Sequence, residues 1–467
     1  MNKRSQLQQP LQYHMYDNGF RIIHETPANK LPITCIRIFC NLGSIHETDQ
    51  SYHGAAHFIE HMCFKGTPKL PNTNEISTKY DEVGAYINAH TEKRYTCYIV
   101  KCHNDNVQQS IQILADMMNH SLFDKREYTK EKHVVLEETI LLNDQPEVIL
   151  FHMIDRLLYQ GSSYEYPIDT MEYHRHPKSL NYESLVEMYK AFYQPSQMIM
   201  SIVSQIPFAR VLQMIRPTAF VRGKSTLNAT AKFPDPNYYL EPHPASIPCT
   251  VLRKKGVQAT YFGIGFRTCP HTNPDKYGID IVKQVIGGYM SSRLFKLLRQ
   301  AQGLTYSSKV YAEYFEHTGK FFIYVSVDHR KIIENVGTSA GAAAKPAVPN
   351  GVIPIIIRML NHLVKTGITQ KELETAKGFL QGNMMLSSEN IDNQGFHNGI
   401  EYLLYDKPEE IVPYSQLYDR FYKVYTKEQI HNIIRRYLNR SNMYVVCLGE
   451  NAPAESAILR ECAKFSG

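Results

Sequence analysis

No run of apolar residues in this sequence is long enough to cross a lipid bilayer. The stretch from Ile353 to Ile357 is among the longest, whereas a transmembrane helix needs about 20 consecutive apolar residues. The segment Met1–Gln9 lacks the apolar core of a secretory signal, and it is too short and too poor in arginine for a mitochondrial presequence. We therefore expect no membrane span, and the sequence favours a cytoplasmic location.

The cysteines form neither a disulfide framework nor a cluster of metal ligands. There are 9 of them, an odd number, and no Cys-x-x-Cys occurs. Several lie in apolar, strand-like runs, namely Cys35, Cys40, Cys97 and Cys447. This pattern is typical of reduced, buried thiols in a cytosol-like compartment. It argues against a redox or metal-storage protein, which would need clustered cysteine ligands.

An excess of charge of one sign is also lacking. The net charge is +6 over 467 residues, and no basic stripe with interleaved aromatic residues occurs, so the sequence does not predict a nucleic-acid partner. With 43% hydrophobic and 21% charged residues, the composition is that of a globular protein rather than a disordered one. A chain of this length favours two domains or more.

The residue patterns that are present mix strands and helices, which predicts an α+β fold. Alternating, β-branched runs predict strands at Phe20–His24, Ile33–Asn41 and Tyr95–Lys101. Helical periodicity is found at His53–Phe64, Asn74–Val83, Val107–Asn119 and near Lys130–Asn143.

Proline recurs between Ile206 and Pro248 while helical periodicity fades, which indicates a connection between domains. Afterwards Gln258–Arg267 repeats the earlier strand pattern and a helix begins near Tyr277, which predicts an internal duplication of roughly 210 residues per half. The expected division is an N-terminal extension at 1–15, an N-terminal domain at 16–225, a linker at 226–248, and a C-terminal domain at 249–467 with a loop insertion at 337–354.

One segment carries recognisable chemistry, His57-Phe58-Ile59-Glu60-His61. Residues four apart lie on one face of a helix, so both imidazoles can point at the same metal ion. Glu60 projects beside them, close enough to act on a water molecule at that metal. The alternative is a surface helix with two solvated histidines. The apolar neighbours of the motif favour a buried helix instead, and buried polar pairs need partners.

A third ligand is available farther along the chain. Glu138 follows His61 after 76 residues, on a long predicted helix, and Glu131 lies seven residues before Glu138 on the same helical face. Two carboxylates stacked in this way suit one ligand and one group that orients a ligand. Two imidazoles and one carboxylate would form a three-ligand zinc site with one position left for water.

These motifs resemble the pitrilysin/insulinase superfamily of inverted zinc peptidases, and within it the β subunit of mitochondrial processing peptidase and its single-chain bacterial relatives. The likeness is carried by the run from His53 to Thr67, by the run from Gly84 to Thr91, by Glu131–Glu138, and by Met290–Phe295 with Gly303–Ser307. It covers most of the chain, from about Tyr16 to Gly449.

The resemblance implies specific roles for individual residues. His57, His61 and Glu138 (rather than Glu137) would hold the metal, one Zn2+ per chain, and Glu60 would be the general base. The accessory acidic position falls on Glu131, and the residues that reach over to bound peptide fall on Arg299 and Tyr306. The substrate would add as a strand near Asn88 and Ala89.

The resemblance also implies a fold, an activity and partners. Two similar domains, each a mostly antiparallel sheet flanked by helices, would face each other as a clamshell. The activity would be that of a zinc-dependent endopeptidase acting on peptides or unfolded protein, and the chain would form a homodimer or a heterodimer with a homologous subunit. The alternative is a non-catalytic scaffold of the same fold. The insertion at 337–354 and the stretch His174-Arg175-His176 depart from the family pattern, and we expect ordinary surface histidines in a loop there.

Overall fold

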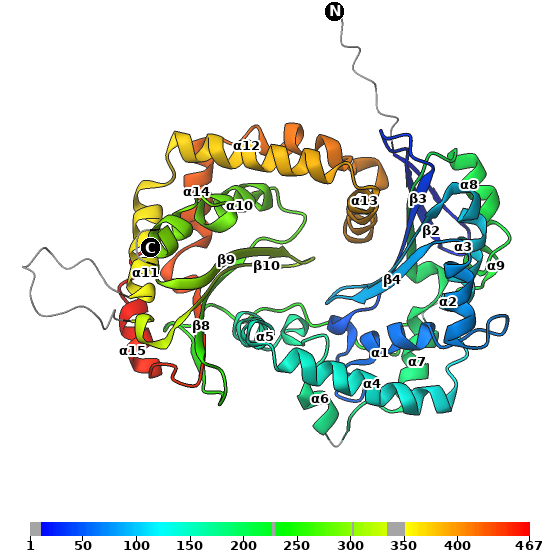
Figure 1. Cartoon of the computed structure of the whole chain (residues 1–467), viewed down its shortest axis with the longest axis horizontal. Helices are drawn as coiled ribbons and strands as arrows, with labels where there is room; N and C mark the ends of the chain where they lie inside the picture. The colour runs from blue at the N-terminus through cyan, green and yellow to red at the C-terminus, as the bar shows by residue number, and fades with distance from the viewer. Residues whose placement is uncertain (1–10, 177, 227–228, 301–302, 334–350) are drawn as a thin grey trace, which may run out of the picture. The chain divides into compact units, whose positions relative to one another are not determined.

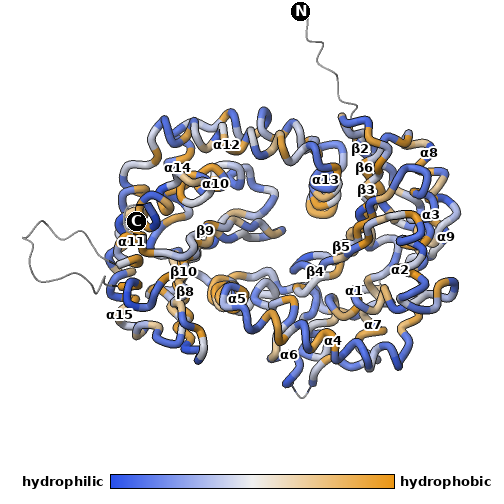
Figure 2. The backbone as a smooth tube through the Cα atoms, viewed as in Figure 1, coloured by the Kyte–Doolittle hydropathy of each residue, from blue (hydrophilic) through white to orange (hydrophobic). Residues whose placement is uncertain are grey.

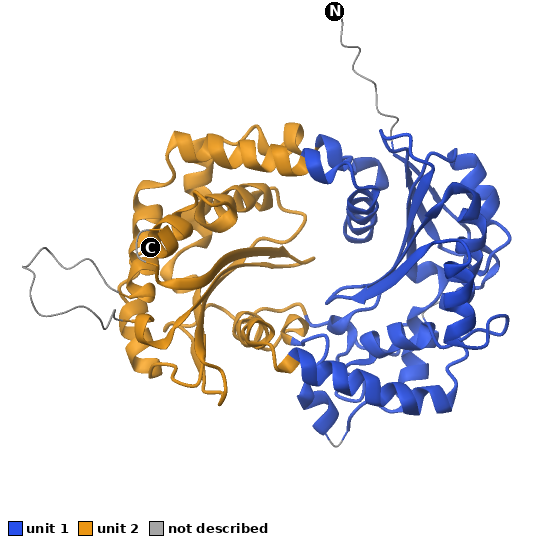
Figure 3. Ribbon diagram, viewed as in Figure 1, with its two compact units in different colours: residues 1–142, 166–237, 385–416 blue, residues 143–165, 238–384, 417–467 orange. Residues whose placement is uncertain are grey.

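A computed structural model describes residues 11–176, 178–226, 229–300, 303–333 and 351–467. The chain forms two compact units (Figure 3): unit 1 comprises 1–142, 166–237 and 385–416, and unit 2 comprises 143–165, 238–384 and 417–467. Neither unit is continuous in sequence, which differs from the two contiguous domains that the sequence predicted. The predicted linker at 226–248 is shared between both units.

Unit 1 is built on a six-stranded sheet with the order β1-β2-β6-β3-β5-β4 (Figure 1). All neighbouring strands are antiparallel except the parallel pair of β2 and β6. The strands are β1 (Gln12–Met15), β2 (Arg21–Glu25), β3 (Ile33–Cys40), β4 (Tyr86–Thr91), β5 (Thr96–His103) and β6 (Met198–Val203). The first of these lies inside the segment predicted as an N-terminal extension, so that prediction was too long.

Both faces of this sheet are covered, which explains why β3 reads as a nearly continuous apolar run. Successive side chains of a strand point to opposite faces. Ile36 and Ile38 therefore pack into the core formed with α1, α3 and α7, whereas Phe39 packs with Tyr402 of α13 on the other face. The helices of unit 1 are α1 (Ala55–Cys63), α2 (Thr73–Asp81), α3 (Val107–Asn119), α4 (Lys125–Asn143), α6 (Met171–Arg175), α7 (Tyr182–Phe192), α8 (Phe208–Ile215), α9 (Ala219–Arg222) and α13 (Ile391–Tyr405).

Two helices fall where the sequence predicted an irregular connection. Both α8 and α9 lie after Ile206, within the proline-rich stretch. Pro207 stands immediately before α8, where a missing N–H costs nothing, and Val211 and Ile215 of that helix are buried. Proline here stands at the start of a helix instead of interrupting regular structure. The first part of the expected linker, up to residue 237, also belongs to unit 1.

Unit 2 repeats the strand order of unit 1 without its outermost strand. The order is β7-β11-β8-β10-β9, and the parallel pair, β7 with β11, occupies the same place as β2 with β6. The strands are β7 (Cys249–Leu252), β8 (Ala259–Thr268), β9 (Thr305–Tyr314), β10 (Gly319–Asp328) and β11 (Met443–Leu448). This common order agrees with the predicted internal duplication and with the predicted class of two mostly antiparallel sheets flanked by helices.

Each half of the chain contributes one helix to the other half's sheet. The helices of unit 2 are α5 (Pro146–Leu158), α10 (Asp275–Lys283), α11 (Val352–Thr366), α12 (Gln370–Ser387), α14 (Lys427–Tyr437) and α15 (Glu455–Cys462). Although α5 follows α4 in sequence, it packs on β8 and β11 of unit 2, and α13 packs on β3 and β6 of unit 1. Figure 2 shows α5 as mostly apolar, whereas α13 has both apolar and polar turns.

Glycine permits the close approach of both exchanged helices. A Cβ at Gly265 of β8 would lie 2.8 Å from the side chain of Ile154 in α5. A Cβ at Gly399 of α13 would lie 2.1 Å from the ring of Phe39 in β3. In each case the missing side chain lets a helix settle directly onto the sheet.

A buried ion pair joins α5 to the sheet of unit 2. The side chain of Lys320 in β10 is 2% exposed, and its Nζ lies 2.7 Å from Asp155 of α5 and 3.0 Å from Glu313 of β9. Lys320→Ala should lower the free energy of unfolding by about 3–5 kcal/mol, because it removes the buried ammonium group that pairs with both Asp155 and Glu313. Urea denaturation of the full chain measures this.

The matched control for that substitution is Lys423→Ala, which removes the exposed pair between Lys423 and Asp419 in the same unit. Exposed pairs contribute little because water and salt screen them. Equal destabilisation by the two substitutions would contradict the role given to the buried pair.

Two glycines in α12 have no steric reason to be glycine. A Cβ at Gly378 or at Gly382 would meet no atom within 4 Å. Alanine at either position should stabilise the helix by about 0.5–1 kcal/mol, since glycine loses more backbone entropy on folding. Thermal denaturation measures the gain. Gly399→Ala is the control of opposite sign, because its new methyl group would clash with Phe39.

Most of the predicted insertion at 337–354 lies outside the described residues. Its last residues are described, and α11 begins at Val352, so the expected loop ends earlier than predicted. Among the described residues no single helix is both long and apolar enough to cross a membrane. The pair α11 and α12 meets the length and composition together, but with a bend of 104° between the two helices.

Candidate metal centre

The metal-binding motif lies on α1, whose apolar side chains fix its orientation in unit 1. The helix begins after Gly54, which has a φ of 84° that favours glycine. Its buried residues are Ala55, Ala56, Phe58, Ile59, Met62 and Cys63. With these positions in the core, His57 and His61 remain together on the other side, and their Nε2 atoms lie 3.2 Å apart.

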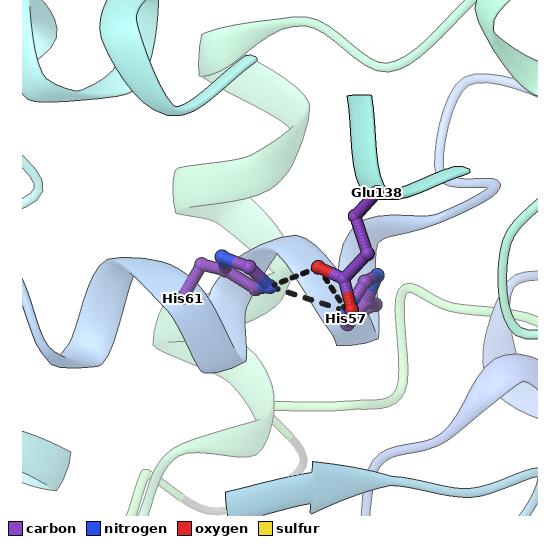
Figure 4. Close-up of side chains that lie close together, drawn as sticks. All are labelled: His57, His61 and Glu138. Atoms are coloured by element: carbon purple, nitrogen blue, oxygen red, sulfur yellow. Dashed lines mark hydrogen bonds and ion pairs between the residues drawn. The ribbon is translucent and has the colours of Figure 1, made fainter. Parts of the chain in front are cut away.

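Glu138 of α4 completes a group of three (Figure 4). Its Oε2 lies 3.4 Å from Nε2 of His61 and 3.9 Å from Nε2 of His57. The ligand atoms of the three residues all lie within 4.8 Å of one another. Zinc bonds of about 2.0–2.2 Å in a tetrahedral arrangement place ligand atoms about 3.3–3.6 Å apart. The spacing therefore fits one zinc ion, and the Glu138 side chain, 45% exposed, leaves the site open to solvent.

Glu131 lies on the same face of α4 as Glu138, but it contacts Nδ1 of His61, the ring nitrogen that does not face Glu138. Its Oε1 is 2.7 Å from Nδ1 of His61, and its Oε2 is 2.6 Å from Nζ of Lys65. Burial raises the pKa of Glu131, but the hydrogen bonds from His61 and Lys65 outweigh it and hold the pKa below its usual value. The structure thus places Glu131 behind a ligand, where it orients the ring, rather than at the metal position.

Glu60 is held by a residue that the sequence did not single out. The hydroxyl of Thr91, at the end of β4, donates a hydrogen bond of 2.6 Å to Oε2 of Glu60. Burial raises the pKa of Glu60, against the lowering effects of Thr91 and of the two histidines. A carboxylate with a raised pKa, fixed at one oxygen, is suited to accept and return a proton.

His57 faces a second carboxylate that sequence reasoning missed, Asp169. Its Oδ2 lies 3.6 Å from Nδ1 of His57, and its Oδ1 lies 3.2 Å from Nε2 of His174. Asp169 comes 112 residues after His57, in a stretch without a recognised motif. The prediction of surface histidines in a loop was wrong for His174, because this residue lies on α6 with a side chain only 17% exposed. His176 instead accepts the backbone N–H of Lys178 in a local turn.

Glu47 fixes the first turn of α1. This residue is fully buried, and its carboxylate accepts the backbone N–H groups of Gly54 and Ala56, each at 2.8 Å. These N–H groups would otherwise have no partner at a helix N-terminus. Burial raises the pKa of Glu47 to about 8, against the lowering effect of the two hydrogen bonds. No motif in the sequence marks this role.

Asn88 and Ala89 lie on β4, at the end of the sheet order of unit 1. The Asn88 side chain accepts the backbone N–H of Ala89 at 2.8 Å and donates to the hydroxyl of Tyr86 at 2.9 Å. The same strand carries Thr91, which contacts Glu60. The strand predicted to receive a peptide therefore adjoins the candidate metal centre through the contact between Thr91 and Glu60.

Arg299 and Tyr306 belong to unit 2. The Arg299 guanidinium lies over the ring of Phe295, 5.5 Å from its centroid, and Tyr306, near the start of β9, is 68% exposed. Their part at a site in unit 1 stays a prediction.

Only the first copy of the duplicated fold carries the motif among the described residues. The helix of unit 2 that follows β8, as α1 follows β3, is α10, and its sequence DKYGIDIVK contains no histidine. The two units thus share a fold, and in the described part of the chain the motif is found in unit 1.

Comparison with known protein families also distinguishes an earlier and a later part of the chain. Residues 26–170 match the family described as insulinase (peptidase family M16), and residues 179–380 match the family described as the peptidase M16 inactive domain. The first match contains the three candidate ligands of unit 1.

Two relatives are similar along most of the chain. The uncharacterized zinc protease YmxG of Bacillus subtilis is 31% identical over 390 residues, which covers 84% of this chain and 87% of that protein. The uncharacterized zinc protease SCO5738 of Streptomyces coelicolor is 26% identical over 375 residues, which covers 79% of this chain and 76% of that protein.

Solved structures share the two-unit fold. A protease from Helicobacter pylori superposes with a TM-score of 0.81 at 19% identity, covering 95% of this chain and 100% of that one. The first half of the periplasmic protease PqqL from Escherichia coli superposes with a TM-score of 0.71 at 17% identity, covering 98% of both chains.

Proposed function

Because the chain belongs to the insulinase family of peptidases, peptidase family M16, we propose that it is a zinc-dependent endopeptidase that cleaves peptides or extended protein segments. The observation that carries this proposal is the convergence of His57, His61 and Glu138 within 4.8 Å. Two imidazoles and a carboxylate are the ligand set of a catalytic zinc site with one open position. We propose one zinc ion per chain, held by these three residues of unit 1.

When bound, zinc supplies Lewis acidity, which lowers the pKa of a coordinated water towards neutrality and polarises the scissile carbonyl. Glu60 would act as the general base: its carboxylate would accept a proton from the attacking water and pass that proton to the leaving amine. The Thr91 hydrogen bond occupies Oε2 of Glu60 and leaves Oε1 for this transfer. Glu131 keeps the His61 ring in place through Nδ1.

Unit 2 and strand β4 supply the remaining proposed roles, which rest on the family resemblance. Tyr306 and Arg299 would stabilise the charge that develops on the carbonyl oxygen. A peptide would pair with the open edge of β4 at Asn88 and Ala89, so that backbone hydrogen bonds give affinity and side-chain pockets give selectivity. Exposure of Tyr306 and the terminal place of β4 in its sheet support these assignments.

The alternative, a non-catalytic scaffold of the same fold, has less support. A scaffold has no physical reason to keep two histidines, a ligand carboxylate and a buried base in one place, since buried polar groups are costly without a purpose. Metal analysis of the purified chain, together with a quenched fluorogenic peptide, separates the two functions. One zinc per chain with cleavage supports the peptidase, whereas a metal-free, inactive and folded chain supports the scaffold.

We also propose that the chain acts as a homodimer or as a heterodimer with a homologous subunit. Relatives of this fold either pair two such chains or fuse them, and the chain has the length of one pair of units. Light scattering of the purified chain tests the homodimer. A monomer that gains activity when a homologous subunit is added points to the heterodimer.

A further inference from the structure

The ring of His57 needs a hydrogen-bond acceptor that is not among the three candidate metal ligands. To bind a metal through Nε2, an imidazole must carry its proton on Nδ1. Nδ1 of His57 is buried and makes no hydrogen bond to any of the described residues. A buried N–H group without an acceptor is energetically costly, so an acceptor is expected close by.

The acceptor nearest at hand is the carboxylate of Asp169. Its Oδ2 stands 3.6 Å from Nδ1 of His57, and a shift of about 0.5 Å brings the pair to hydrogen-bond distance. Asp169 is 7% exposed, so water cannot readily take its place.

Three groups fix this carboxylate in position. The hydroxyl of Thr139 on α4 donates to Oδ2, the oxygen that faces His57. Oδ1 accepts the backbone N–H of Thr170 at 2.8 Å and lies 3.2 Å from Nε2 of His174 on α6. A carboxylate held at both oxygens therefore stands behind His57.

We propose that Asp169 is the positioning residue of the metal ligand His57. Thr139 and His174 form its support, and the carboxylate fixes the tautomer and the orientation of the ring. His61 is held in the corresponding way by Glu131, so each histidine ligand has its own carboxylate, one from α4 and one from the turn before α6. This inference rests on the proposed function, because it concerns the same metal site.

The test compares zinc affinity, measured by competition with a chromogenic chelator, in the full-length wild type and in Asp169→Asn and Asp169→Ala. Loss of an outer partner of a metal-binding histidine typically lowers affinity by about 10–100-fold. We expect a loss near the lower figure for Asp169→Asn, which keeps one acceptor oxygen, and near the higher figure for Asp169→Ala. Thr139→Val should give a smaller loss, since it frees the carboxylate without removing it.

A matched control is available in Asp116→Asn. Asp116 is 6% exposed, and it too accepts from a threonine hydroxyl and a histidine, namely Thr67 at 3.1 Å and His120 at 3.0 Å. Both substitutions should lower the melting temperature of the metal-free protein. Asp169→Asn alone should also lower zinc affinity and shift the visible absorption bands of the cobalt-substituted protein, because a purely structural role would leave the ligand field unchanged.

The outcomes separate the two proposals. If the wild type binds zinc and both Asp169 variants bind it within about threefold of the wild type, the inference is overturned and the proposed function stands. A wild type that folds but binds no zinc overturns both. If Asp169→Ala does not fold, Asp169→Asn and Thr139→Val decide the matter with the same criterion.

Discussion

Glu60→Gln is expected to bind zinc as tightly as the wild type and to lower kcat for peptide cleavage by about 10²–10⁴-fold, the range that a general base contributes. The amide keeps the shape of the side chain and can still accept the hydrogen bond from Thr91. It cannot accept the proton that the attacking water must lose. Zinc content by mass spectrometry and turnover of a fluorogenic peptide measure the two effects separately.

A control for Glu60→Gln is Glu187→Gln. Glu187 also accepts a hydroxyl hydrogen bond, from Tyr52 at 3.0 Å, and it lies in the same unit. Its substitution should leave both zinc content and turnover unchanged. Turnover close to wild type in Glu60→Gln would overturn the assignment of the general base.

The second large effect concerns the carboxylate ligand. Glu138→Gln should weaken zinc binding by more than about 100-fold, beyond the loss that outer partners produce, because a neutral amide oxygen replaces a charged ligand. Glu137→Gln is the matched control, one residue away on the same helix. It should bind zinc normally, since Glu138 and not Glu137 lies with the two histidines.

Chelator competition on both variants measures this difference. Equal losses for Glu137→Gln and Glu138→Gln would show that the ligand had been assigned to the wrong neighbour. A loss for Glu137→Gln alone would require α4 to turn relative to α1 when zinc binds.

The part of the site that the sequence predicted is the part that helical geometry determines locally. His57, Glu60 and His61 lie within one turn and a half of α1, so their spacing alone places them on one side of the helix. The seven-residue spacing of Glu131 and Glu138 likewise places both on one face of α4. That Glu131 contacts Nδ1 of His61, and not the metal position, depends on how α4 packs against α1, which periodicity does not encode.

The partners from distant elements were not predictable in this way. Thr91 reaches Glu60 from the end of β4, and Asp169 reaches His57 from the turn before α6. Threonine and aspartate are common in turns and at strand ends, so nothing in their neighbourhoods marks them as special. His174 was predicted to be an ordinary surface histidine for the same reason, because its partner became visible only in three dimensions.

The fold shows the same division between local and distant information. The predicted strands and helices of unit 1 are present, and the repeat of the strand order in unit 2 agrees with the predicted duplication. The sequence did not predict that α5 packs on the sheet of unit 2 and α13 on the sheet of unit 1. The apolar pattern of a helix is the same whichever sheet the helix covers. The glycines at 265 and 399 show where each helix docks, but their purpose is evident only from the neighbouring side chains.

The most direct measurement of the central claim is anomalous X-ray diffraction at the zinc absorption edge from crystals of the zinc-loaded chain. We predict one zinc peak per chain, about 2.0–2.2 Å from Nε2 of His57, Nε2 of His61 and a carboxylate oxygen of Glu138. A folded, zinc-saturated chain in which Glu138 turns away from both imidazoles, or in which the zinc peak lies elsewhere, would contradict the claim.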